Sequence, residues 1–139
     1  MDHRIIDLHV HSTESDGTLT PEDLVAEAKK AGLAAFALTD HDTCQGVGKA
    51  MPCAASAGIE LIPGIELSTD YHGKEVHIVG LYIDIENEQL LKKTAEYRKC
   101  RSERNALMVE ALRKEGLSIT MEELVAENPD CVITRANIA

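Results

Sequence analysis

The first part of the chain alternates short apolar runs, rich in β-branched residues, with amphipathic segments. The apolar runs predict buried strands, at residues 4–10, 33–42, 59–71 and 75–85. The amphipathic segments predict two helices, at residues 20–32 and 46–58. Runs that are apolar on both faces and joined by helical crossovers are typical of a parallel sheet covered by helices. The pattern therefore predicts an α/β fold.

Local signals refine these boundaries. Thr20 is a suitable N-cap for the first helix, and Pro21 fits its first position. Pro63 and Gly64 divide the third apolar run into one or two short strands. The His-Gly-Lys sequence at residues 72–74 predicts a turn before the last strand.

The rest of the chain has a different pattern. Residues 87–116 are strongly charged and predict one long helix, and residues 118–130 predict a short helix with Ser118 or Thr120 as its cap. Residues 132–139 resemble the beginning of a helix capped by Thr134. The composition changes near residues 84–88, which is the candidate internal boundary.

Charge is distributed unevenly. The formal net charge is −10, yet residues 89–114 carry eight Lys or Arg and three Glu, a net +5, so the remainder carries −15. The acidic balance argues against binding of duplex nucleic acid, and the few aromatic residues argue against a stacking surface for single strands. The basic residues of 89–114 are most simply a solvated helix face. A solvated acidic surface and a metal site explain the acidic remainder about equally well.

The cysteines do not form a recognisable framework. Cys44, Cys53, Cys100 and Cys131 are widely spaced without a C-x-x-C pair, which argues against a zinc ribbon and a disulfide scaffold. The N-terminus has no long apolar stretch, and no segment approaches 18 apolar residues. We therefore expect a cytoplasmic protein with reduced thiols and no membrane partner.

Candidate chemistry collects at the ends of the predicted strands. His9 and His11 lie two residues apart on one strand, so both side chains point to one face, which Asp7 shares. The carboxyl ends of parallel strands meet at one edge, where such side chains come together. Imidazoles and carboxylates are ligands for divalent cations. The remaining candidates follow the same strands: Asp16, Asp40, His41, Asp42, Glu66 and His77.

Each candidate also has a plainer interpretation. A single strand histidine such as His77 is more often a hydrogen-bonded core residue, and Asp16 beside Gly17 is typical of a turn. Asp7 and Asp40 are as suited to orienting ligand histidines as to binding metal. His3 and His72, near the terminus and in a turn, are expected on the surface.

In combination, the motifs "DLHVHSTESDG", "ALTDHD", "IPGIELS" and "EVHIVGLY" resemble the PHP (polymerase and histidinol phosphatase) superfamily, in its stand-alone phosphoesterase branch. The resemblance covers residues 7–82. It implies the N-terminal part of a distorted (β/α)7 barrel at residues 1–85 and the start of a helical insertion at 86–139. It also implies two to three divalent metal ions (Mn, Zn or Fe) and hydrolysis of phosphate esters of nucleotides or short oligonucleotides by metal-activated hydroxide.

The resemblance assigns roles to individual residues. It implies a metal-binding set of six residues: His9, His11, Asp16, His41, Glu66 and His77. Glu66 would bridge two ions, and Asp7, Asp40 and Asp42 would support the ligands from outside. Arg135 would approach the substrate phosphate. Asn137 stands where relatives often carry a histidine, so no phosphate contact is expected there.

The family also supplies a later His and an Asp-x-His pair from the second half of the barrel, and this chain ends at Ala139. We therefore expect a fragment with exposed sheet edges and apolar faces that self-associates. Two rival hypotheses stay open. The first is a metal-binding module without catalysis. The second is an amidohydrolase-like enzyme, because a strand-borne His-x-His also opens that superfamily.

Overall fold

The computed structural model describes residues 5–127, 129 and 131–139. Its elements follow in order: β1 (Ile5–Val10), α1 (Pro21–Lys30), β2 (Leu33–Leu38), α2 (Gln45–Ala57), β3 (Glu60–Tyr71), β4 (Lys74–Leu81), α3 (Glu88–Lys114) and α4 (Met121–Glu127). The predictions for His3, for residue 4 of the first strand and for residues 128 and 130 lie outside the described residues.

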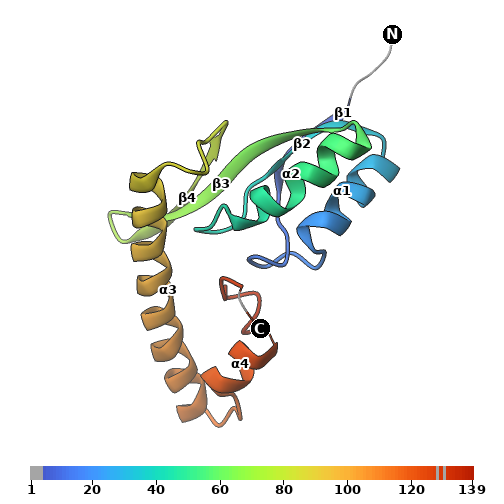
Figure 1. Cartoon of the computed structure of the whole chain (residues 1–139). Helices are drawn as coiled ribbons and strands as arrows, with labels where there is room; N and C mark the ends of the chain where they lie inside the picture. Colours follow the sequence, from blue (N-terminus) through green and yellow to red (C-terminus); the bar gives the residue numbers. More distant parts are fainter. Residues whose placement is uncertain (1–4, 128, 130) are drawn as a thin grey trace.

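The strands form one sheet in the order β1-β2-β3-β4 (Figure 1). The predicted parallel pairing is found among β1, β2 and β3, whereas β4 runs antiparallel to β3. His72 and Gly73 both have positive φ, 53° and 74°, and form the tight turn that reverses the chain. The turn predicted at 72–74 is therefore confirmed. A connection this short permits only antiparallel pairing of the two strands that it joins.

Of the one or two short strands expected here, the structure has one, β3, which is 12 residues long and is not interrupted at Pro63 and Gly64. Pro63 lacks an N–H, but its carbonyl accepts a hydrogen bond from Ile83 N–H at 3.2 Å. A Cβ on Gly64 would lie 2.7 Å from Thr39 Cγ2 and 2.9 Å from the Leu38 carbonyl oxygen. Glycine thus permits a close approach between β3 and the end of β2.

Helices α1 and α2 pack together over one face of the sheet (Figure 1). Alternation along β2 sends Phe36 and Leu38 towards these helices, where both are fully buried. Ala35 and Ala37 point to the opposite face and pack with Ile62. The main core therefore lies between the helices and the sheet. Burial of each Phe or Leu side chain there contributes about 1.5–3 kcal/mol to stability.

β1 was expected to be buried and is exposed. Ile5 and Ile6 are 59% and 53% exposed. β1 is one of the two edge strands of the described sheet and pairs only with β2, so its other edge has no strand beside it among the described residues.

The long helix α3 leaves the sheet after β4, and α4 with the C-terminal residues folds back towards the sheet (Figure 1). Thr120 caps α4 in a reciprocal box with Glu123. The helix beginning expected at 132–139 is a single turn, in which Thr134 Oγ accepts from Ala136 N–H at 3.1 Å. None of the helices within the described residues is long and apolar enough to span a membrane.

Candidate metal centre

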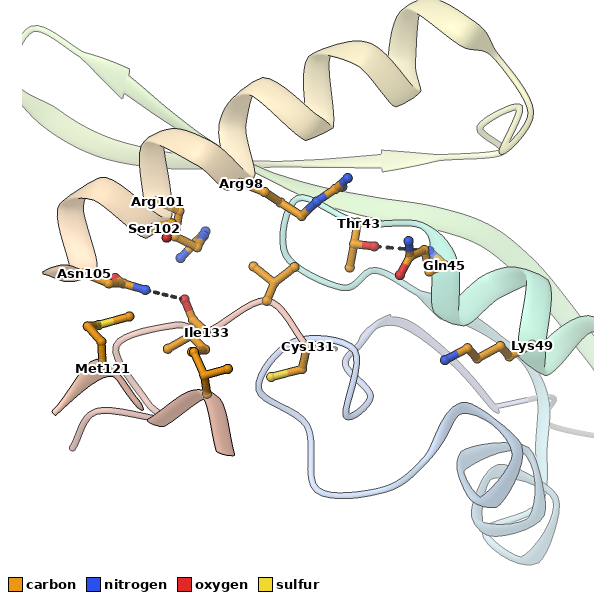
Figure 2. A pocket seen from close by; sticks show the side chains of 12 residues that line it. Thr43, Gln45, Lys49, Arg98, Arg101, Ser102, Asn105, Met121, Cys131 and Ile133 are labelled. Carbon is orange, nitrogen blue, oxygen red and sulfur yellow. Dashed lines mark hydrogen bonds between the residues drawn. The ribbon is translucent and has the colours of Figure 1, made fainter. Parts of the chain in front are cut away.

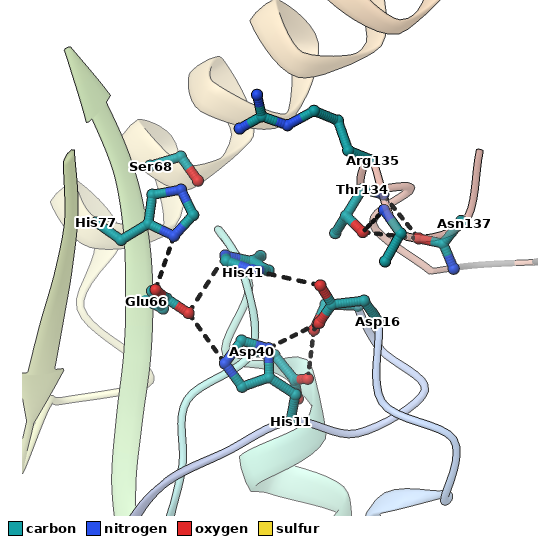
Figure 3. Close-up of polar contacts among 12 residues, drawn as sticks. His11, Asp16, Asp40, His41, Glu66, Ser68, His77, Thr134, Arg135 and Asn137 are labelled. Carbon is teal, nitrogen blue, oxygen red and sulfur yellow. Dashed lines mark hydrogen bonds and ion pairs between the residues drawn. The ribbon is translucent and has the colours of Figure 1, made fainter. Parts of the chain in front are cut away.

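Six of the histidines and carboxylates singled out in the sequence lie together at one rim of the sheet (Figure 3): His9, His11, Asp16, His41, Glu66 and His77. His9 and His11 come from the end of β1, and His41 follows β2. The segment after β2 continues to pair with β3, since Glu66 N–H donates to the Asp40 carbonyl and Asp42 N–H donates to the Glu66 carbonyl. This pairing places His41 directly beside Glu66.

Glu66 lies at the middle of the cluster and is 4% exposed. Its Oε2 is 3.0 Å from His9 Nε2 and 2.9 Å from His11 Nε2. Its Oε1 is 2.8 Å from His77 Nδ1, which reaches it from the neighbouring strand β4. The two oxygens of one carboxylate therefore face different histidines, as a bridging ligand requires.

Asp16 forms a second centre of the cluster. Its Oδ1 is 2.8 Å from His11 Nδ1, and its Oδ2 is 3.4 Å from His41 Nε2. His11 thus contacts Asp16 through one ring nitrogen and Glu66 through the other.

Three groups of side chains place one potential ligand atom each within 4.8 Å of one another. They are His9–His11–Glu66, His11–Asp16–His41 and His41–Glu66–His77. His11, His41 and Glu66 each belong to two groups. The three groups therefore share residues and form one continuous cluster.

Asp40 contacts the loop rather than a histidine ring. Its carboxylate accepts hydrogen bonds from Ser12 N–H, Ser12 Oγ–H and Ser15 Oγ–H, each at 2.7 Å. These bonds hold the loop that carries Asp16. Asp7 lies on the exposed side of β1, where its carboxylate accepts from His9 N–H at 3.1 Å.

Asp42 turns away from the histidines towards α3. Its Oδ1 accepts from Ser68 N–H at 3.0 Å, and its Oδ2 accepts from Arg101. Arg98 donates to the Asp42 carbonyl at 2.9 Å. Arg101 is 7% exposed, so the expectation that the basic residues of this helix form only a solvated face is wrong.

The C-terminal turn brings Arg135 to the same rim (Figure 3). Its guanidinium donates a hydrogen bond to Glu75 on β4. The Asn137 side-chain oxygen accepts from Thr134 N–H at 2.7 Å. Asn137 therefore stabilises the turn that presents Arg135.

A cavity of about 610 Å³ lies next to the rim, between the start of α2, α3, α4 and the C-terminal segment (Figure 2). Its polar lining includes Lys49, Arg98 and Arg101, and its apolar lining includes Met121 and Val125. Asn105 donates to the Ile133 carbonyl at 2.8 Å and ties α3 to the C-terminal segment across this cavity.

With this geometry in place, comparison with known proteins identifies the family. Residues 7–126 match the PHP domain. The chain belongs to the PHP family.

The PHP chain is similar to two curated bacterial proteins. It is 37% identical to the 5'-3' exoribonuclease Rnm of Escherichia coli over 97% of this chain and 47% of that protein. It is also 37% identical to the 3',5'-nucleoside bisphosphate phosphatase of Chromobacterium violaceum, over 96% of this chain and 47% of that protein. The chain spans about half the length of the curated relatives it matches.

The fold of the chain is also similar to that of a solved structure. A protein of Bifidobacterium adolescentis described as a metal-dependent phosphoesterase superposes with a TM-score of 0.88 at 33% identity, over 97% of this chain and 48% of that one. The observed α/β sheet accordingly matches part of a PHP barrel.

The side chains of this PHP domain suit divalent metal ions. His41 Nδ1 is buried and lacks a hydrogen-bond partner among the described residues, although Glu66 Oε2 lies 3.5 Å away. An unsatisfied buried imidazole nitrogen facing a carboxylate is a position that a cation would satisfy. The donor set of imidazole nitrogens and carboxylate oxygens fits zinc, iron or manganese.

Electrostatics show how tightly these groups interact. Hydrogen bonds from His11 and His41 hold the pKa of Asp16 far below its usual range. Burial alone would lower the pKa of His11, but its hydrogen bond to Asp16 and the nearby carboxylates raise it. Burial alone would raise the pKa of Glu66, and the surrounding histidines lower it. The carboxylates are therefore ionised at neutral pH, as metal ligands must be.

Two residues of this rim were not singled out in the sequence. Glu75 contacts both His77 and Arg135, and Arg101 contacts Asp42. Glu75 lies two residues before His77 on the same strand, so strand periodicity was sufficient to place it on the face of His77. Arg101 had no such signal, because only the packing of α3 against the rim reveals its partner.

Proposed function

We propose that this chain carries the metal-binding rim of a phosphoesterase that hydrolyses phosphate esters of nucleotides or short oligonucleotides. The observation that supports it best is Glu66, whose two oxygens face His9 and His11 on one side and His77 on the other. The similar proteins of known name act on RNA and on nucleoside bisphosphates. The proposed boundary between barrel and helical insertion is residues 85/86.

The proposed ligands are the six residues of the three groups, and the proposed ions are two or three, manganese, zinc or iron. His9, His11 and Glu66 would hold one ion, and Glu66 and His77 would hold a second. Asp16 and His41 would hold a third. Divalent ions at such sites supply an activated water at neutral pH and positive charge opposite the phosphoryl oxygens.

The residues of the chain itself would orient the reaction. Glu66 would set the spacing of the ions it joins. Asp40 would fix Asp16 by holding the loop between β1 and α1. Arg135 would contact a phosphoryl oxygen, because its side chain is 57% exposed and lies on the same rim.

Metal analysis and hydrolysis test the proposal together. The purified chain should contain Mn, Zn or Fe by elemental analysis, and His41→Ala should lower that content. His72→Asn, in the β3–β4 turn, is the matched control and should not. The metal-loaded protein should hydrolyse p-nitrophenyl phosphate, a chelator should abolish hydrolysis, and added Mn²⁺ should restore it. Metal binding without hydrolysis would favour the non-catalytic module, and absence of bound metal would overturn both.

The exposed apolar surface favours self-association. Ile5 and Ile6 on β1 and Ile78 on β4 are each more than half exposed. Light scattering after size-exclusion chromatography should give a mass above 15.2 kDa, and a monodisperse monomer would contradict this part of the proposal. All four cysteines are unpaired, and cytoplasm is the proposed location.

A further inference from the structure

Glu75 joins two parts of the rim. It lies on β4 two residues before His77, so both side chains point to one face of the strand. Glu75 Oε1 is 3.0 Å from His77 Nε2, while the other ring nitrogen of His77 is 2.8 Å from Glu66 Oε1. The imidazole of His77 is therefore held between two carboxylates, one inside the cluster and one outside it.

The second oxygen of Glu75 reaches the C-terminal turn. Arg135 Nη2 donates to Glu75 Oε2 across a sequence separation of 60 residues. Arg104 adds positive charge, with Nη1 3.8 Å from Glu75 Oε1. His77 and Arg135 therefore contact different oxygens of the same Glu75 carboxylate.

From these contacts we propose that Glu75 is a positioning residue that orients His77 for metal binding and holds Arg135 beside the metal rim for phosphate binding. The inference rests on the proposed function and adds a residue to it.

Orientation of His77 follows from its two ring nitrogens. When Nδ1 faces Glu66 and a cation, Nε2 must carry the proton and needs an acceptor. Glu75 supplies that acceptor, and a carboxylate at this place fixes the tautomer and the ring plane. Removal of such a partner typically weakens metal binding about 10–100-fold.

Placement of Arg135 follows from its backbone. The segment that carries it is a single turn rather than a helix, and a long side chain on such a segment has many rotamers. Among the described residues, Glu75 is the carboxylate that Arg135 contacts. A guanidinium has several donors, so Arg135 keeps donors for a phosphate group while it remains bonded to Glu75.

A purely structural role makes different predictions. The Glu75 and Arg135 side chains are 31% and 57% exposed, and an exposed ion pair contributes little to stability. Loss of such a pair alone would shift the unfolding midpoint slightly and leave metal and phosphate affinity unchanged.

The test uses titration calorimetry on the whole chain, first with Zn²⁺ and then with inorganic phosphate on zinc-saturated protein. The variants are Glu75→Gln, Arg135→Gln and the double variant, with Glu75→Asp as a conservative rescue. Glu60→Gln, an exposed glutamate at the start of β3, is the matched control. Circular dichroism confirms that each variant is folded.

Glu75→Gln should weaken zinc binding about 10–100-fold, and Arg135→Gln should not. Both should weaken phosphate binding, and the double variant should lose less than the two single losses combined, because Glu75 acts on phosphate through Arg135. Glu75→Asp should recover part of the zinc affinity. Unchanged zinc affinity in Glu75→Gln, or fully additive phosphate losses, would overturn the proposal.

These readouts separate the two proposals. If the wild-type chain binds zinc and phosphate but Glu75→Gln binds both equally well, only the role of Glu75 is rejected. If the wild-type chain binds both and hydrolyses nothing, catalysis by this chain is rejected while the binding result on Glu75 stands. If it binds neither, the metal rim fails, and the role of Glu75 fails with it.

Discussion

Arg101 in α3 donates two hydrogen bonds to one carboxylate oxygen of Asp42, at 3.0 Å from Nε and 2.6 Å from Nη2. The side chains are 7% and 1% exposed, so both charges are buried. Asp42 also has a positive φ of 54°, a conformation that Asp tolerates better than most residues. This pair connects the segment after β2, which carries His41, to the long helix.

Removal of Arg101 should therefore be costly. Arg101→Ala leaves the Asp42 carboxylate buried without its cation, and we expect a loss of about 3–5 kcal/mol in the free energy of unfolding. Urea denaturation measures this loss. Arg113→Ala, on an exposed position near the end of the same helix, should change stability by less than about 0.5 kcal/mol. Equal effects at the two positions would show that the buried pair contributes nothing special.

Glu66 and Asp42 should behave differently when their charge is removed. Glu66→Gln retains the size of the side chain but loses the carboxylate that faces His9, His11 and His77, so metal content should fall strongly. Asp42→Asn should chiefly lower the unfolding free energy, because its carboxylate contacts Arg101 and Ser68 rather than a histidine. Elemental analysis and urea denaturation of both variants distinguish the two effects, and a larger metal loss in Asp42→Asn would contradict the geometry.

Gly17 should tolerate no side chain. A Cβ at this position would lie 2.2 Å from the His11 carbonyl oxygen and 2.7 Å from Ser12 Cα, so the backbone of the loop would have to move. Because Asp16 is adjacent, Gly17→Ala should lower both stability and metal affinity.

Gly32→Ala is the control for this substitution. Gly32 has a positive φ of 76°, but the space that a methyl group would take there is open, so its cost should be only about 1–2 kcal/mol of backbone strain, with metal affinity unchanged. Thermal unfolding and calorimetry compare the two variants. Retention of wild-type metal affinity in Gly17→Ala would show that the loop adapts.

The cysteines should react at different rates. Burial raises the pKa of the Cys44 thiol, which reduces its thiolate fraction at pH 8, whereas Cys100 is exposed on α3. Iodoacetamide should therefore modify Cys100 first and Cys44 much later. Peptide mass spectrometry over time gives the order, and Cys100→Ser removes the fast phase. Early modification of Cys44 would indicate that α2 opens readily.

Much of the candidate site follows from the local pattern of residues along the sequence. Strand alternation places His9 and His11 on one face, and the ends of neighbouring parallel strands bring His41 close to them. The cap at Thr20 and the turn at 72–74 follow from local chemistry and are confirmed, with the Thr20 hydroxyl accepting from Asp23 N–H at 3.1 Å. Such features need only residues a few positions apart.

Other features depend on contacts between distant segments. The exposure of β1 depends on what lies beside it, and the continuity of β3 through Pro63 depends on the close approach of β2. The partners of Arg101 and Glu75 are 59 and 60 residues away in sequence. From the sequence alone, a charged side chain in a helix is interpreted as solvent-exposed. Only the packing of distant segments shows that a buried carboxylate contacts it.

The sequence by itself therefore determined the order of strands and helices, the family motifs and the residue types at the rim, because these depend on local periodicity and composition. Only the tertiary structure decided which oxygen of Glu66 faces which histidine. It also decided that Asp42 binds a side chain of α3 rather than a histidine, and that Glu75 contacts both His77 and Arg135. Those relationships arise when separate segments pack, and the energies of buried charge pairs depend on that packing.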